Sequence, residues 1–250
     1  MGLWIKRAAA ALALTTPLAP GTAQAQDGST LLARVDSVLT APRDQSAVER
    51  MTLIDRDGST KERELRFYQK GSEKRLVRFV KPADVRGVAF LRLADDRMYL
   101  YLPAFRRVRR IASSIKNEGF MGTDFSYEDL SQTSYSEDYE VTAVSKGPGS
   151  YALTLERRDG ADVSYARLVM EFGEADWVVR KIDYFDESGE RIKTFTATEV
   201  RQIDGYAYVT RMEMVTWKSG HRTVLELEEL RLDSGLSDDL FTQRSLKRPV

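Results

Sequence analysis

Short turn signals rich in glycine recur from residue 57 onward, at the intervals that separate neighbouring antiparallel strands. They are Asp57-Gly58, Gly147-Pro148-Gly149, Asp159-Gly160, Ser188-Gly189, Asp204-Gly205 and Ser219-Gly220. The segments between them are rich in aromatic and β-branched residues, as in Tyr151–Leu155, Trp177–Phe185, Tyr206–Trp217 and Thr223–Leu232. This pattern predicts a mainly β protein, an antiparallel meander of about ten or eleven strands.

One segment ahead of the strands has helical spacing instead. Between Gly28 and Thr40 the apolar residues fall on a single stripe. Ser29 or Thr30 is the expected N-cap, and Pro42 prevents any continuation of the helix. A second, short helix is expected after Ser237. Because no linker-like stretch or repeat divides the remainder, we expect one domain over residues 26–250.

The N-terminal residues have the three parts of a secretory signal peptide. Lys6 and Arg7 form the positive region, Ala8–Leu14 the apolar region, and Ala23-Gln24-Ala25 the cleavage site. Proline and threonine interrupt the apolar run well short of the roughly 20 residues that a membrane span requires. The sequence therefore predicts a soluble periplasmic protein, cleaved after Ala25.

Composition excludes many kinds of site. The chain has no Cys and one His, so disulfides, Cys-based metal sites and a lipid-anchored N-terminal Cys are ruled out. Lys+Arg and Asp+Glu both number 38, which gives no bulk charge for nucleic-acid binding. Phosphate-binding and calcium-binding loop motifs do not occur. We expect no cofactor, no metal and no nucleic acid partner.

His221 is the one residue that leaves a hydrolase open as a rival interpretation. Ser and Asp are plentiful, so a Ser-His-Asp triad is conceivable, but the G-x-S-x-G motif of many hydrolases does not occur. The carboxylate pairs along the chain are adjacent residues, which point to opposite faces of a strand. We therefore expect no catalytic residues.

Some of the expected strands are apolar on both faces. In Met98–Leu102, Met98, Leu100 and Leu102 share one face while Tyr99 and Tyr101 share the other. A second apolar face must be covered by a helix, packed on another sheet, or exposed to an apolar cavity. The pattern by itself leaves these alternatives open.

The densest run of charge is Phe105–Ile111, in which Arg107 and Arg109 would share one strand face. One interpretation is a solvated strand with acidic partners across the sheet. The alternative is that Arg107 and Arg109 bind an anionic head group or an acidic partner surface, because arginine binds phosphate through two hydrogen bonds.

The segment Gly119–Leu130 is aromatic and bounded by glycine, as expected of a loop or short helix that closes over an apolar surface. The candidate lid residues are Phe120, Met121, Phe125 and Tyr127. A plug that merely caps the core is the alternative.

Three blocks in this order, Pro82–Leu91, Tyr101–Ile111 and Met121–Leu130, resemble the outer membrane lipoprotein-sorting protein family of the LolA/LolB-like superfamily. The resemblance covers about residues 82 to 130. It implies an incomplete antiparallel β-barrel covered by helices, whose concave apolar face carries acyl chains.

The resulting hypothesis is a non-enzymatic periplasmic carrier that binds acyl chains of lipoproteins, or a phospholipid-like lipid, and moves them toward the outer membrane. Its expected partners are an inner-membrane exporter and an outer-membrane acceptor, with transient membrane contact at most. The alternative is an accessory subunit of an RND-type or lipid-export complex, with no exchangeable ligand. The predicted cavity lining is Leu65, Phe67, Val77, Phe79, Leu91, Leu93, Tyr99 and Tyr101. A shift of one residue would exchange the two faces of any strand.

Overall fold

The computed structural model describes residue 1 and residues 27–249. Apart from Met1, the predicted signal peptide lies outside the described residues. Within residues 27–249, thirteen strands form one antiparallel sheet in the order β6-β5-β4-β3-β2-β1-β13-β12-β11-β10-β9-β8-β7. The strands are β1 (Asp44–Ile54), β2 (Thr60–Lys70), β3 (Lys74–Lys81), β4 (Ala89–Leu93), β5 (Arg97–Leu102), β6 (Arg107–Arg110), β7 (Tyr139–Gly147), β8 (Ser150–Arg157), β9 (Arg167–Gly173), β10 (Val179–Phe185), β11 (Arg191–Ile203), β12 (Tyr206–Thr216) and β13 (His221–Leu232).

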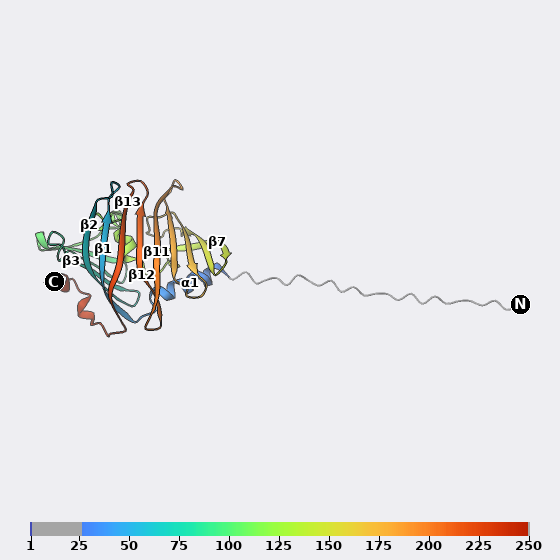
Figure 1. Cartoon of the computed structure of the whole chain (residues 1–250), viewed down its shortest axis with the longest axis horizontal. Coiled ribbons are helices and arrows are strands. Elements are labelled where there is room, and N and C mark those ends of the chain that lie inside the picture. Colours follow the sequence, from blue (N-terminus) through green and yellow to red (C-terminus); the bar gives the residue numbers. More distant parts are fainter. Residues whose placement is uncertain (2–26, 250) are drawn as a thin grey trace.

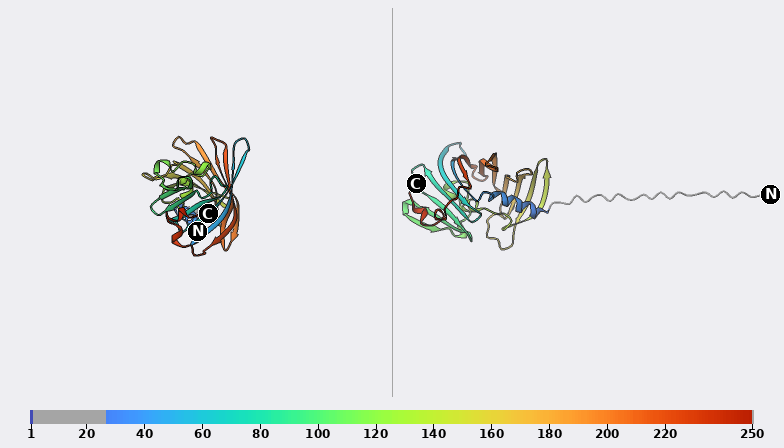
Figure 2. Two further views of the ribbon diagram at one scale, coloured as in Figure 1. Left: turned by 90° about the vertical axis from the view of Figure 1, so that its left-hand side faces the viewer. Right: turned by 90° about the horizontal axis from the view of Figure 1, so that it is seen from below.

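The sheet consists of two meanders that meet at its centre. From the centre, strands β1 to β6 follow one another toward one edge and β13 to β7 toward the other edge. The two central strands, β1 and β13, pair with Met51 opposite Leu225. Figure 1 shows β2, β1, β13, β12 and β11 side by side across the front of the molecule. Because β6 and β7 are the two edges and do not pair with each other, the curled sheet is an open barrel (Figure 2).

The helical elements are few and short. They are α1 (Gly28–Leu39) and α2 (Tyr127–Ser131), with 3₁₀ turns η1 (Pro103–Phe105), η2 (Ser113–Ile115), η3 (Phe120–Gly122), η4 (Asp238–Leu240) and η5 (Ser245–Lys247). Asp27, rather than Ser29 or Thr30, caps α1, because its carboxylate accepts the Ser29 N–H at 3.2 Å. The short helix expected after Ser237 is η4, which Ser237 caps.

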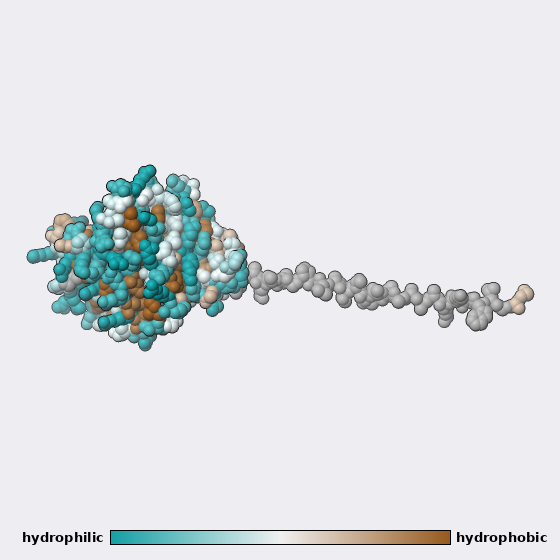
Figure 3. All heavy atoms as spheres, viewed as in Figure 1, coloured by the Kyte–Doolittle hydropathy of each residue, from teal (hydrophilic) through white to brown (hydrophobic). Residues whose placement is uncertain are grey.

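The main core lies between the concave face of the sheet and α1. Leu31, Leu32 and Val35 form the buried stripe of α1 and pack with inward-facing strand residues such as Met51 and Leu153. A smaller second core lies on the outer face of β3 and β4, where Leu76 and Leu91 pack with Phe241 and Leu246 of the C-terminal segment. The rest of the outer face viewed in Figure 3 is mostly hydrophilic, with a hydrophobic stripe along its middle strands.

The predicted fold class, a mainly β incomplete antiparallel barrel with few helices, is confirmed. The number of strands in residues 27–249 is thirteen rather than about ten or eleven. The edge strands explain why the sequence pattern predicts too few strands. Strand β6 has only four residues and β7 is mostly exposed, so neither shows a clear alternation of apolar residues. No helix in residues 27–249 is long and apolar enough to span a membrane.

Candidate ligand cavity

A cavity of about 540 Å³ lies on the concave side of the sheet, between α1 and the segment that links β6 to β7. Its volume is within the roughly 300–1,000 Å³ of small-molecule sites. Most of its lining is apolar, and it comes from both meanders. The apolar lining includes Val38, Leu39, Met51, Leu65, Phe67, Val77, Phe120, Phe125, Leu130, Val179, Ile182, Phe195, Val209, Met212, Met214 and Leu225.

Two other hollows have a different character. One, of about 760 Å³, is lined by Asp55, Arg56, Asp57, Lys193 and other polar groups. The other, of about 590 Å³, lies beside β6 and is lined largely by charged and hydroxyl side chains. Burial of an acyl chain requires apolar walls, so the cavity on the concave side is the candidate site.

The segment that covers the cavity, residues 119–132, is the lid. Phe120 stacks on Phe79 with ring centroids 5.2 Å apart and meets Tyr127 edge-on at 5.8 Å. Helix α2 begins with a capping box, in which Ser126 and Asp129 exchange hydrogen bonds. These contacts give the five-residue helix a defined position that its length alone would not give it.

Polar contacts tie the lid to the meander of β7 to β13, and tie the residues just after the lid to α1. The carboxylate of Glu128 accepts the Ser164 N–H at 3.0 Å, and Lys193 of β11 lies 3.0 Å from Asp129. Asp36 of α1 accepts the backbone N–H groups of Tyr135 and Ser136, just beyond the lid, at 2.8 and 2.9 Å. The lid is therefore a closed cover held by specific bonds.

Arg75 of β3 is a half-buried cation at the inner side of the lid. Its Nη1 donates to the backbone oxygens of Leu130 and Gln132 at 2.8 and 3.1 Å, and its Nε and Nη2 donate to Gln69 Oε1. Burial lowers its pKa to about 10. The guanidinium thus links the sheet directly to the C-terminal end of α2.

Acidic and amide side chains share the cavity wall with Arg75. Gln45 and Glu49 both lie on the concave side of β1, and both are buried. Burial raises the pKa of Glu49 to about 7, partly offset by the positive charge of Arg75. Gln45, Glu49, Gln69 and Arg75 therefore form a polar patch in the mostly apolar cavity wall, which also includes Asp129, Gln132, Asp176 and Gln202.

The structure brings five of the residues predicted for the site together at the cavity. Leu65, Phe67 and Val77 line its wall, and Phe120 and Phe125 close it from the lid. Phe79 faces the same side but is fully buried beneath Phe120. Two further lid residues pack nearby, since Met121 is partly buried against the core and Tyr127 is buried against Phe90. The ligand-binding role of these residues stays a prediction.

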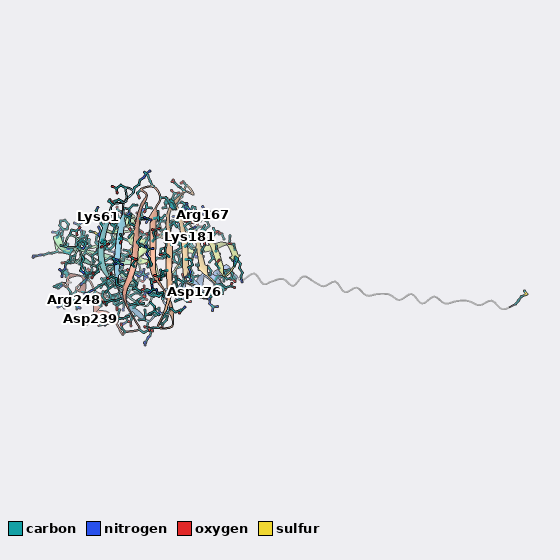
Figure 4. All side chains as sticks on the ribbon, viewed as in Figure 1. Lys61, Arg167, Asp176, Lys181, Asp239 and Arg248 are labelled. Carbon is teal, nitrogen blue, oxygen red and sulfur yellow. The ribbon has the colours of Figure 1, made fainter. Side chains whose placement is uncertain are left out.

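The positions predicted on β4 and β5 require a correction, because Leu91, Leu93, Tyr99 and Tyr101 do not line the cavity. They face outward, against the C-terminal segment. In Figure 4 the labels Asp239 and Arg248 mark that segment beside the sheet, away from the strand that carries Lys181. Register explains the placement: Val77 pairs with Phe90 and Phe90 with Leu100, so Phe90 and Leu100 continue the inner face.

Arg107 and Arg109 lie on the edge strand β6, exposed and outside the cavity lining. The guanidinium of Arg109 lies 6.0 Å from the ring centroid of Phe105, which is also exposed. Both side chains are exposed, as the first interpretation expects, but the residues paired with them on β5 are Leu102 and Leu100 rather than acidic residues. Their assignment to a head group or partner is not tested by this placement.

His221 lies at the polar hollow rather than at the cavity. Its Nδ1 is 2.6 Å from Asp124 Oδ2, and its Nε2 is 3.8 Å from Asp55 Oδ1. Ser219 is engaged with backbone groups, accepting from the His221 N–H and donating to the Thr216 carbonyl. The described residues thus contain a His-Asp pair at this position but no complete Ser-His-Asp triad. They also contain no group of three acidic or histidine side chains that could hold a metal.

The sequence analysis missed Gln45, Glu49 and Arg75. One signal for the first two is present in β1, where alternation places Gln45 and Glu49 on the same face as Met51 and Leu53. Polar residues on an otherwise apolar strand face mark either a buried polar site or a wet edge. Arg75 carries the same signal, since alternation along β3 places it on the face of Val77 and Phe79.

Comparisons with known proteins agree with this architecture. A family model with the description "Uncharacterized protein" matches residues 71–248. No curated protein is similar enough to count as a match. A DUF1329 family protein from Desulfovibrio piger is 29% identical with a TM-score of 0.81, covering 88% of this chain and 97% of that one.

Two further structures carry more informative descriptions. A LolA superfamily protein from Nitrosomonas europaea shares the fold at 19% identity and a TM-score of 0.73, over 88% of this chain and all of that one (100%). A domain from Vibrio parahaemolyticus, described as an outer membrane lipoprotein-sorting protein, is 30% identical with a TM-score of 0.78, over 87% of this chain and 97% of that one. The chain therefore shares the fold of the LolA superfamily protein and belongs to the outer membrane lipoprotein-sorting protein family.

Proposed function

We propose that this protein is a periplasmic carrier that binds acyl chains of lipoproteins or lipids in the cavity and moves them toward the outer membrane. The observation that carries the proposal is the cavity of about 540 Å³, apolar over most of its wall and closed by a bonded lid. Each buried CH₂ group contributes roughly 0.8 kcal/mol, so an acyl chain binds there with little need for polar contacts.

The lid supplies the second argument. Bonds such as those from Arg75 to Leu130 and Gln132 are individually reversible, so the lid can open and close without unfolding of the sheet. A cover of this kind would admit a chain and then exclude water from it. Holding and releasing cargo needs no bond-breaking chemistry, so the proposed activity is not enzymatic.

The cellular setting is part of the proposal. The predicted signal peptide, with cleavage after Ala25, would deliver the protein to the periplasm. There it would accept cargo from an inner-membrane exporter and pass it to an outer-membrane acceptor, with transient membrane contact at most. Exposed Arg107 and Arg109 on β6 are candidates for contact with an acidic partner or a lipid head group.

The accessory-subunit alternative predicts a concavity filled by side chains and no exchangeable ligand. The volume of the cavity favours the carrier. If no ligand enters the cavity, the accessory-subunit alternative is favoured. Ligand uptake therefore distinguishes the two proposals.

Uptake of a fluorescent fatty acid tests the carrier proposal. Met212 of β12 lines the cavity, and a Met212→Trp variant should fill part of it and weaken uptake at least fivefold. Tyr99→Trp adds the same side chain on the outer face and should leave uptake unchanged. No saturable uptake by the unmodified protein, or equal effects of the two variants, would refute the proposal.

A further inference from the structure

The polar patch within the cavity includes acceptor groups that have no donor. The Oε1 atom of Gln45 is buried and makes no hydrogen bond within residues 27–249. The carboxyl group of Glu49 likewise receives no hydrogen bond from any described side chain or backbone group. Gln45 is 6% exposed and Glu49 8%, and both residues line the cavity. The Oε1 atom of Gln45 itself has almost no accessible surface, so the side-chain amide must turn for a ligand donor to reach it.

Neighbouring groups do not satisfy these acceptors. The hydrogen bonds of Arg75 go to Gln69, Leu130 and Gln132, so its charge acts on Glu49 through space, without an ion pair between them among the described residues. Tyr208 of β12 also lines the patch. A buried acceptor left without a donor costs about 1–3 kcal/mol. The cost is recovered if a ligand brings the donor.

We propose that the polar end of the cargo carries an uncharged hydrogen-bond donor, an amide N–H or a hydroxyl, and that Gln45 and Glu49 accept from it. This inference rests on the proposed carrier function and specifies its ligand. A donor that is uncharged fits best because the cation Arg75 already lies in the same patch. The acyl chain then extends from the patch along the apolar wall beyond Met51 and Leu225.

Two ligands with the same acyl chain test the inference. Monopalmitoylglycerol has hydroxyl donors and methyl palmitate has none. Each displaces a fluorescent fatty acid from the cavity, and the ratio of their affinities is measured in the unmodified protein, in the double variant Gln45→Leu/Glu49→Leu and in Glu49→Gln. Gln202→Leu, an exposed position at the rim of the cavity, is the matched control.

The preference for monopalmitoylglycerol should fall about tenfold in the double variant, which corresponds to ~1.4 kcal/mol. Glu49→Gln, which keeps a carbonyl acceptor, and Gln202→Leu should retain most of the preference. Replacement of unpaired buried polar groups by leucine should not lower the melting temperature, which thermal denaturation checks.

The head-group inference and the carrier function can fail independently in this experiment. An equal affinity ratio in the unmodified protein and the double variant overturns the head-group inference while leaving the carrier function intact. If neither ligand displaces the probe, the carrier function fails and the inference fails with it.

Discussion

Nη1 of Arg75 on β3 lies 2.8 Å from the backbone oxygen of Leu130, at the end of the lid helix α2. A half-buried guanidinium so placed joins the sheet to the cover of the cavity. Its replacement affects both the lid and the polar groups that it leaves behind.

Arg75→Met should lower the free energy of unfolding by about 1–3 kcal/mol, because Gln69 and the lid carbonyls lose their donor. Amide hydrogen exchange should accelerate in residues 127–132, and a bound acyl ligand should dissociate faster. Arg66→Met, at an exposed position on the neighbouring strand β2, is the control and should change neither. Unchanged exchange in the lid of Arg75→Met would show that this contact does not hold it.

Glu49 should make stability depend on pH. Its pKa is raised to about 7 in the folded protein, so the folded state binds more protons than the unfolded state between about pH 4.5 and pH 7. The free energy of unfolding should therefore fall as pH rises through this window, by up to about 3 kcal/mol, and level off above it. The charged and titratable groups that face Glu49 are Arg75 and Tyr208.

Other carboxyl groups titrate in the same window, so the informative quantity is the difference between the unmodified protein and Glu49→Gln. Denaturant melts at closely spaced pH values should show a flatter profile in Glu49→Gln, while exposed Glu62→Gln keeps the original slope. Parallel profiles for all three proteins would mean that Glu49 is not the group responsible.

His221 should act as a structural anchor of the lid. It contacts Asp124, the neighbour of Phe125, and Thr223 donates to the same carboxylate at 2.7 Å. His221→Ala should lower the free energy of unfolding by about 1–3 kcal/mol, while the exposed neighbour Arg222→Ala changes it little. Ester hydrolysis should not differ between His221→Ala and the unmodified protein. A loss of hydrolysis in that variant would instead favour an enzyme.

Leu246 should stabilise the fold without affecting the cargo. It is fully buried against Leu76 and Leu91 on the outer face. Leu246→Ala should cost about 2–5 kcal/mol of unfolding free energy, with acyl-chain affinity unchanged once the folded fraction is accounted for. Weaker binding by the folded variant would indicate that the outer core and the cavity are coupled.

Strand alternation predicted the site where each strand has one polar and one apolar face. On β2, Leu65 and Phe67 flank exposed Arg66, so their common inner face follows from the sequence. On β5, Met98 and Tyr99 are both large and apolar enough for either face, and alternation could not choose between them. The choice depends on the C-terminal segment, whose Phe241 and Leu246 cover the outer face from more than 140 positions away in the sequence.

The polar patch escaped the sequence analysis for a related reason. Alternation places Glu49 with Met51 and Arg75 with Val77, but it does not show whether this face of the sheet is covered. The cover is the lid, and the contact of Arg75 with it depends on tertiary structure. The family resemblance predicted the open barrel and its lid. Which residue each lid side chain contacts could be learned only from the tertiary structure.

The most direct test is mass spectrometry of an organic extract from the protein purified out of the periplasm without detergent. The carrier account predicts about one acyl-chain lipid or acylated peptide per protein molecule, and less of it in Met212→Trp. An extract without any acyl compound, from protein that also fails to take up a fluorescent fatty acid, would contradict the account and favour the accessory subunit.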